Sequence, residues 1–303
     1  MSTGIVFQQM VIIFLLIITG CIVYKRGIVG AEVSKGISAL VVNVCNPAIL
    51  IRSSFDRDPQ VTNDKLVLAV LGCVVLYGIL LAASFILPRC LKVGEMWKNH
   101  YAMMCLFGNT GFIGIPLVSA VLGSQALIYV AVNNAFFNLF FYTYGIRLAD
   151  KENGRFHWKS FLNVGNISIL LTIILFFWQP TIPVVFSSTV NHIADTTTFL
   201  AMVVIGISLA RTNLAEIFTN GKMYLFIALR FLLLPIGISL LLRLFIHDAM
   251  VYGVIVLMAC VPVANLPLMR VEEVGGDGRV LSCGIILSTV LSIITIPLVV
   301  AFV

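Results

Sequence analysis

Two short segments combine helix-breaking residues with amides and a hydroxyl, the groups that could bind a solute. The first reads GNTGFIGIPL at 108–117 and the second reads VPVANLP at 261–267. Proline lacks a backbone N–H and glycine loosens a helix, so each segment predicts an interruption within an apolar helix. The predicted substrate-binding residues are Gly108, Asn109, Thr110, Gly111, Pro262, Val263, Ala264 and Asn265, with Pro116 and Pro267 as helix breakers.

Such interruptions are costly in lipid, because they leave backbone groups without partners. A break therefore persists only where it lines a cavity or is covered by protein. The N-terminal end of each half-helix carries partial positive charge and attracts an anion, whereas the C-terminal end attracts a cation. Ordinary kinks are the alternative, but two breaks at matching positions favour a binding site.

Four other polar residues lie in or near apolar stretches. Asn134 and Asn138 are four residues apart and share a helical face, which either lines the cavity or hydrogen bonds to a neighbouring helix. Arg230 either holds a substrate carboxylate or snorkels to the cytoplasmic interface, and we expect snorkelling. Asp195 is either a proton relay or, as we expect, an acid that stabilises the first turns of its helix.

Enzyme chemistry has no support in the sequence. There is no HExxH, GxSxG or Walker A motif and no pair of intramembrane aspartates, and the four histidines lie near the ends of apolar stretches. The seven cysteines include no CxxC pair, so neither a disulfide framework nor a metal site is expected. We predict a protein that is not an enzyme and has no cofactor, with H⁺ and Na⁺ both open as coupling ions.

Composition places the chain in a membrane. Apolar residues make up 60% of the sequence and charged residues only 11%, against roughly 25% charged residues in soluble domains. The mean hydropathy is +1.08. A net charge of +6 would suggest nucleic acid for a soluble protein, but here the basic residues lie in short loops between apolar runs. Lipid, and not nucleic acid, is therefore the expected partner.

Ten stretches are long enough to cross a bilayer, which takes about 20 mostly apolar residues. They lie at roughly 5–24, 33–53, 65–87, 100–122, 125–147, 160–178, 190–210, 222–246, 250–270 and 280–302. Of the 19 Lys and Arg residues, fourteen lie in one set of alternate loops, four in the other, and Arg230 within a span. The positive-inside rule makes the first set cytoplasmic, so both termini of this multi-pass protein should face outward from the cell (inner) membrane.

The longest polar connection divides the spans into five and five. We expect a first repeat at 1–148, a cytoplasmic connector at 149–159 and a second repeat at 160–303. Since five is an odd number, the second repeat must be inverted relative to the first, an arrangement typical of secondary transporters. The predicted fold is an all-α membrane protein of ten transmembrane helices in two inverted five-helix repeats, with the fourth and ninth helices broken.

The sequence resembles the auxin efflux carrier family, in particular its compact bacterial members described as malate or malonate permeases. The resemblance rests on both interrupted segments, on NPAIL at 46–50 and on Leu287-Ser288-Thr289 through Ile296-Pro297-Leu298. It implies a fold similar to bile-acid/sodium symporters. In that fold helices 1, 2, 6 and 7 form a scaffold, helices 3–5 and 8–10 form a moving transport domain, and the broken helices 4 and 9 cross at the substrate site.

Two departures from the plant carriers guide the choice of substrate. Gly108 stands where they have proline, and their long cytoplasmic loop is missing, so a small carboxylate is expected rather than auxin. The expected function is secondary transport of a small organic anion by an elevator-like alternating-access motion. An ion or solute channel and a membrane receptor without flux are the alternatives. A second copy of the chain, bound through the scaffold helices, is a further expected partner.

Overall fold

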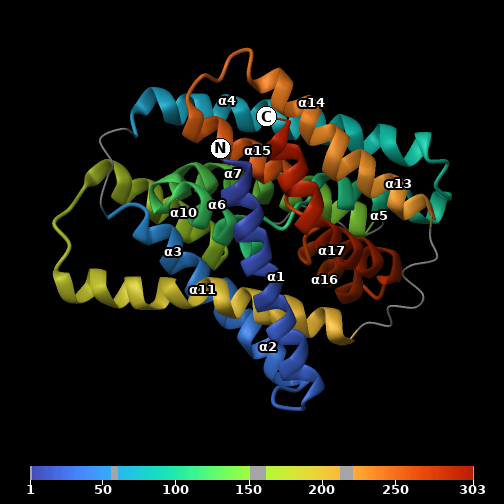
Figure 1. Ribbon diagram of the computed structural model, residues 1–303, viewed down its shortest axis with the longest axis horizontal. Helices are drawn as coiled ribbons and strands as arrows, with labels where there is room; N and C mark the ends of the chain where they lie inside the picture. Colours follow the sequence, from blue (N-terminus) through green and yellow to red (C-terminus); the bar gives the residue numbers. More distant parts are fainter. Residues whose placement is uncertain (1, 56–60, 151–161, 212–220, 303) are drawn as a thin grey trace.

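The computed structural model describes residues 2–55, 61–150, 162–211 and 221–302 (Figure 1). These residues form helices joined by short turns, and no strand longer than a single bridged pair occurs among them. The connector predicted at 149–159 lies outside the described residues from 151 onward.

Among the described residues, seven continuous helices are long and apolar enough to span a membrane. They are Thr3–Lys25 (α1), Glu32–Arg52, Asn63–Cys90 (α4), Ser124–Ala149, Val184–Arg211 (α11), Gly221–Leu242 and Arg279–Ala301 (α17). Three of them are composite. The second span consists of α2 (Ala31–Leu40), η1 (Val41–Cys45) and α3 (Asn46–Arg52). The span at Ser124–Ala149 consists of η3 (Ser124–Ala126), α7 (Leu127–Phe140), η4 (Phe141–Gly145) and α8 (Ile146–Ala149). The span at Gly221–Leu242 consists of α13 (Gly221–Ala228), η5 (Leu229–Leu233) and α14 (Leu234–Leu242).

Shorter helices lie between these spans. They are α5 (Glu95–Leu106), η2 (Thr110–Gly114), α6 (Ile115–Leu122), α10 (Val164–Trp178), α15 (Ala249–Cys260) and α16 (Leu266–Glu273). Large apolar side chains are exposed along the helices, among them Leu15, Val74 and Leu170. Exposure of so much apolar surface to water would be energetically unfavourable, so the chain is an integral membrane protein.

Proline shapes three of the helices through π-helical turns. Such turns lie at Val41–Cys45 before Pro47, at Thr110–Gly114 before Pro116 and at Leu229–Leu233 before Pro235. A proline ring clashes with the carbonyl one turn earlier, and the wider π turn relieves that clash. The chain therefore bends at these points without leaving the helix.

The helices pack in two groups around α1, which runs through the middle of Figure 1. In one group α11 contacts α1, α2 and α3, and α3 contacts α10; in the other, α4 contacts α5, α7 and α15, and α17 contacts α5 and α15. The contact between α1 and α11 is close because Gly20 and Gly206 face it. A Cβ on Gly206 would lie 2.0 Å from the carbonyl oxygen of Ile17, so glycine lets the backbones meet.

Both chain ends lie in the upper part of Figure 1, where α1 begins and α17 ends. α1 and α17 are also in contact. The two ends of the described chain therefore lie on the same side of the molecule.

Candidate functional site: the crossing of two interrupted helices

Both predicted interruptions are present. The first helix stops at Leu106, where α5 ends, and resumes at Thr110 in η2. The second stops at Cys260, where α15 ends, and resumes at Leu266 in α16. Two half-helices therefore end, and two begin, within these short stretches of chain.

The two interrupted stretches lie against each other and share hydrogen bonds. The backbone N–H of Asn109 donates to the carbonyl oxygen of Pro262 at 2.6 Å, and that of Ala264 donates to Phe107 at 3.0 Å. Backbone groups buried away from water need such partners. Each interrupted segment thus supplies hydrogen-bond partners for backbone groups of the other. This explains how two broken helices persist at one place.

Gly108 permits this close approach. It forms an isolated antiparallel bridge with Val263. A Cβ on Gly108 would lie 2.7 Å from Cγ2 of Val261 and 3.3 Å from the Val261 carbonyl oxygen. In this packing a Cβ would force Val261 or the backbone to shift, so the glycine of the sequence has a steric reason here.

The two asparagines predicted to bind substrate differ in their surroundings. Asn109 is buried, and its Oδ1 accepts a hydrogen bond from the backbone N–H of Phe112 at 3.1 Å. It therefore caps the first turn of its own half-helix. Asn265 is half-buried at the start of α16 and makes no such capping bond. The Asn109 side chain has a structural role in addition to any contact with a solute.

Asn46, from α3 in the other packing group, lies beside the first half-helix. A Cβ on Gly111 would lie 3.3 Å from Asn46 Nδ2. Oδ1 of Asn46 is buried and has no hydrogen-bond partner among the described residues. Asn46 belongs to the NPAIL motif of the sequence, and its amide lies next to the predicted site.

Asn134 and Asn138 of α7 have different partners. Nδ2 of Asn138 donates to Oδ1 of Asn166 in α10 at 2.6 Å. Of the two roles considered for this face, lining a cavity or bonding to a neighbouring helix, Asn138 therefore has the second. Oδ1 of Asn134 is buried without a hydrogen-bond partner in the described part of the chain. Since α7 contacts η2, Asn134 is the better candidate to lie beside the crossing.

Arg230 does not snorkel, and that interpretation is wrong. Its side chain is 0% exposed and lies in the π-helical turn η5. Nε donates to the carbonyl oxygen of Cys105, and Nη1 donates to that of Ala259 at 2.9 Å. These carbonyls belong to the last turns of α5 and α15. The interrupted helices thus supply acceptors within the protein for two of its nitrogens, while Nη2 is buried without a hydrogen-bond partner among the described residues.

The interpretation of Asp195 is also wrong, because its helix begins earlier than predicted. α11 starts at Val184, so Asp195 lies about three turns into the helix. Its carboxylate is 69% exposed and pairs with Nη1 of Arg52 at 2.5 Å. An ion pair between α3 and α11 therefore takes the place of the expected interaction with the helix dipole.

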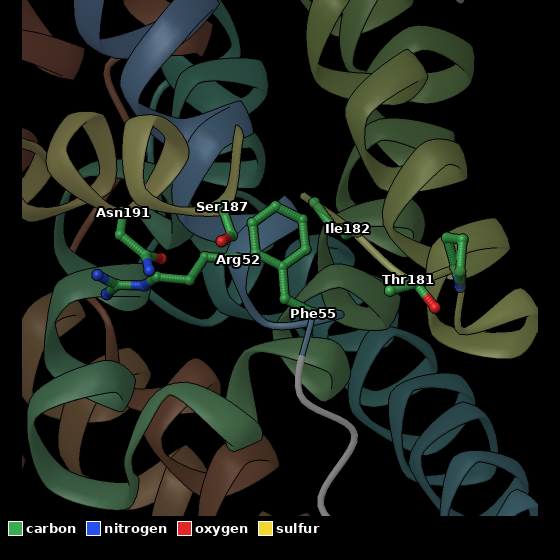
Figure 2. Close-up of a pocket in the computed structure, with 7 residues that line it drawn as sticks. Arg52, Phe55, Thr181, Ile182, Ser187 and Asn191 are labelled. Atoms are coloured by element: carbon green, nitrogen blue, oxygen red, sulfur yellow. The ribbon is translucent and has the colours of Figure 1, made fainter. Parts of the chain in front are cut away.

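A pocket of about 260 Å³ lies beside this ion pair (Figure 2). It is lined by Arg52, Phe55, Pro180, Thr181, Ile182, Ser187 and Asn191. Figure 2 shows Arg52 next to Asn191. Nε of Arg52 and Oδ1 of Asn191 are buried and lack hydrogen-bond partners among the residues that the structure describes. No lining residue belongs to the interrupted segments, so the pocket is a second polar region, separate from the crossing.

Metal ligands do not gather at either region. Within the described residues, no group of three or more His, Cys, Asp or Glu side chains could hold a metal ion.

Comparison with known proteins finds relatives along nearly the whole chain. Residues 5–300 match the family described as membrane transport protein. An "uncharacterized transporter" from Methanothermobacter thermautotrophicus strain Delta H is 25% identical over 295 residues, which cover 94% of each chain. These matches confirm the family resemblance seen in the interrupted segments and agree with the membrane-spanning helices. The chain belongs to the membrane transport protein family.

Proposed function

We propose that this membrane transport protein is a secondary transporter that moves a small organic anion, a carboxylate such as malate or malonate, across the cell membrane. The observation that supports the proposal is the crossing. Two half-helices begin there, one at Thr110 and the other at Leu266. Each N-terminal end carries about half a positive charge. Together with nearby amides, these ends suit a carboxylate in a site that excludes water.

The proposed topology has ten spans in two inverted repeats, 1–148 and 160–303. Seven continuous helices, the shorter α10 and the two interrupted helices together supply the ten. An even number of spans fits chain ends that lie on the same side of the molecule (Figure 1). The excess of Lys and Arg in alternate loops supports a position of those ends outside the cytoplasm.

The proposed mechanism is an elevator-like alternating-access motion. We assign α1, α2–α3, α10 and α11 to the scaffold and the remaining spans to the transport domain. The two packing groups support this division. Asn46 of the scaffold then meets Gly111 of the transport domain at the surface that must slide. The scaffold helices are also the proposed contact between two copies of the chain.

Binding and flux measurements test the function together. Purified protein is first screened by thermal shift against dicarboxylates, amino acids and aromatic acids, each with and without Na⁺. The best ligand is then followed into proteoliposomes. A transporter gives saturable uptake and counterflow, a channel gives flux without counterflow, and a receptor gives binding without flux. Either of the last two outcomes would refute the proposal.

Labelling of single cysteines tests the topology in a background from which the seven native cysteines are removed. Positions in the 149–159 connector should react only from the cytoplasmic side, and positions in 181–189 only from outside. The opposite pattern at either place would exclude the ten-span arrangement.

A further inference from the structure

The first interruption leaves helical carbonyls without their usual donors, and that of Cys105 is one of them. In a continuous α-helix, the N–H of Asn109 would bond to the carbonyl of Cys105, four residues earlier. Here that N–H instead bonds to Pro262 in the other interrupted segment. The carbonyl of Cys105 is bonded by Nε of Arg230. The arginine therefore replaces the donor that the first break diverts.

The second interruption repeats this arrangement. A continuous helix would bond the N–H of Val263 to the carbonyl of Ala259. In the structure that N–H donates to Oγ of Ser288 in α17, at 3.0 Å. Nη1 of Arg230 bonds to the carbonyl of Ala259 instead. One guanidinium thus replaces one missing donor in each interrupted helix.

Charge strengthens this arrangement. The C-terminal ends of α5 and α15 each carry about half a negative charge, and a buried cation there is favoured. An arginine keeps its charge even when buried, and its planar fork can serve two acceptors in fixed directions. Its guanidinium carbon also lies 4.7 Å from the ring centre of Phe231, within the range of a cation–π contact. No carboxylate pairs with Arg230 among the described residues.

We propose that Arg230 is a positioning residue that caps both interrupted helices at once, and that its guanidinium takes the place that a bound cation would otherwise occupy at their C-terminal ends. The inference deepens the proposed function and, as far as transport is concerned, rests on it. By joining α5 to α15, Arg230 keeps the two half-helix N-termini in register for a solute. It also makes a coupling Na⁺ unnecessary at this point of the crossing.

Hydrogen exchange of the purified protein tests this inference without any substrate or flux, so its failure is distinguishable from failure of the proposed function. Exchange is followed in peptides that cover 107–109 and 261–265. In Arg230→Met, which keeps much of the volume but removes charge and donors, these segments should exchange roughly ten- to a hundredfold faster. Arg243→Met is the matched control, since Arg243 is exposed at the end of the same composite helix.

Conservative variants separate capping from simple packing. Arg230→Lys, which retains the charge, should recover part of the protection, and neutral Arg230→Gln should recover less. In the wild type, replacing choline with Na⁺ at constant ionic strength should leave exchange at the crossing unchanged. If Arg230→Met does not fold, the lysine and glutamine variants are compared with each other.

Four results would overturn the inference. They are wild-type exchange in Arg230→Met, an equal rise throughout the chain, equal exchange in the lysine and glutamine variants, and slowing of wild-type exchange by Na⁺. The last result would show that a bound cation, and not the guanidinium, serves these carbonyls.

Discussion

Arg230 and Arg52 both come from membrane-spanning helices, yet their surroundings are opposite. Arg52 is the last residue of α3 and lines the pocket of Figure 2, where it pairs with the exposed carboxylate of Asp195. Arg230 is fully buried and bonds to two backbone carbonyls. A broken helix can therefore hold a charge in the protein interior, because its free carbonyls replace part of the water that the charge loses.

The two regions are also rival places for the transported anion. The pocket offers a cavity and an arginine, but Asp195 already balances the charge of Arg52. The crossing offers two half-helix N-termini and the amides beside them. We favour the crossing, and variants in the two regions distinguish these places.

The largest effect is expected from Thr110→Asp, which puts an acid at the start of the first half-helix. An acid there interacts well with the helix dipole, which offsets part of the cost of burying it at this position. A carboxylate substrate would meet a like charge a few ångströms away in a poorly hydrated site. The cost is several kcal/mol, or a roughly thousandfold loss of affinity. Uptake and ligand-induced thermal shift at matched protein levels measure it.

The neutral Thr110→Val serves as the control for lost polarity. Leu266→Asp applies the same charge to the second half-helix and asks whether both N-termini face the anion. Wild-type transport in Thr110→Asp would move the anion away from the crossing and make the pocket the better candidate.

A smaller effect is expected from Gly108→Ala, which would separate the interrupted segments. The added Cβ meets Val261 at 2.7 Å, and overpacking of this kind costs about 1–3 kcal/mol. Thermal stability and uptake should both fall. Gly78→Ala is the control, because a Cβ at this exposed position in α4 meets nothing within 4 Å. Equal stability of the two variants would mean that close approach at Gly108 is unimportant.

Sequence patterns predicted the interruptions because proline and glycine act locally. Pro262 removes a donor whatever surrounds it, and Gly108 permits a contact that no side chain could make. The role of Arg230 could not be predicted in this way. Its two carbonyl partners lie 125 and 29 residues away in the chain, so only the packed structure shows that one side chain reaches both.

Helix boundaries explain the error at Asp195. The predicted span begins near 190, but residues 184–189 (VVFSST) extend the helix back to Val184. Hydropathy marks where a helix can enter lipid and not where the helix starts. Three π-helical turns before prolines were also missed, although Pro47, Pro116 and Pro235 were visible signals for them.

The two asparagines of the crossing should separate stability from transport. Asn109→Ala removes an N-cap and should lower the free energy of unfolding by about 1 kcal/mol, whereas Asn265→Ala should leave stability near the wild-type value. Both variants should lose uptake if both amides contact the solute. Asn109→Ser, which keeps a capping oxygen, should restore stability without restoring uptake. Wild-type uptake in both alanine variants would remove these amides from the site.

The smallest effect is expected at the ion pair beside the pocket. Because the Asp195 carboxylate is 69% exposed, the pair contributes about 0–1 kcal/mol at most. Asp195→Asn and Arg52→Gln should therefore change thermal stability little.

If the anion binds at the crossing, both variants should also transport with close to wild-type affinity. If it binds in the pocket, the two variants should move affinity in opposite directions. Arg52→Gln would weaken binding by removing the attracting charge, and Asp195→Asn would strengthen binding by removing the competing carboxylate. Uptake measured over a range of concentrations of the best carboxylate tells the two cases apart, since a general loss of folding would lower both variants together and could not produce opposite signs.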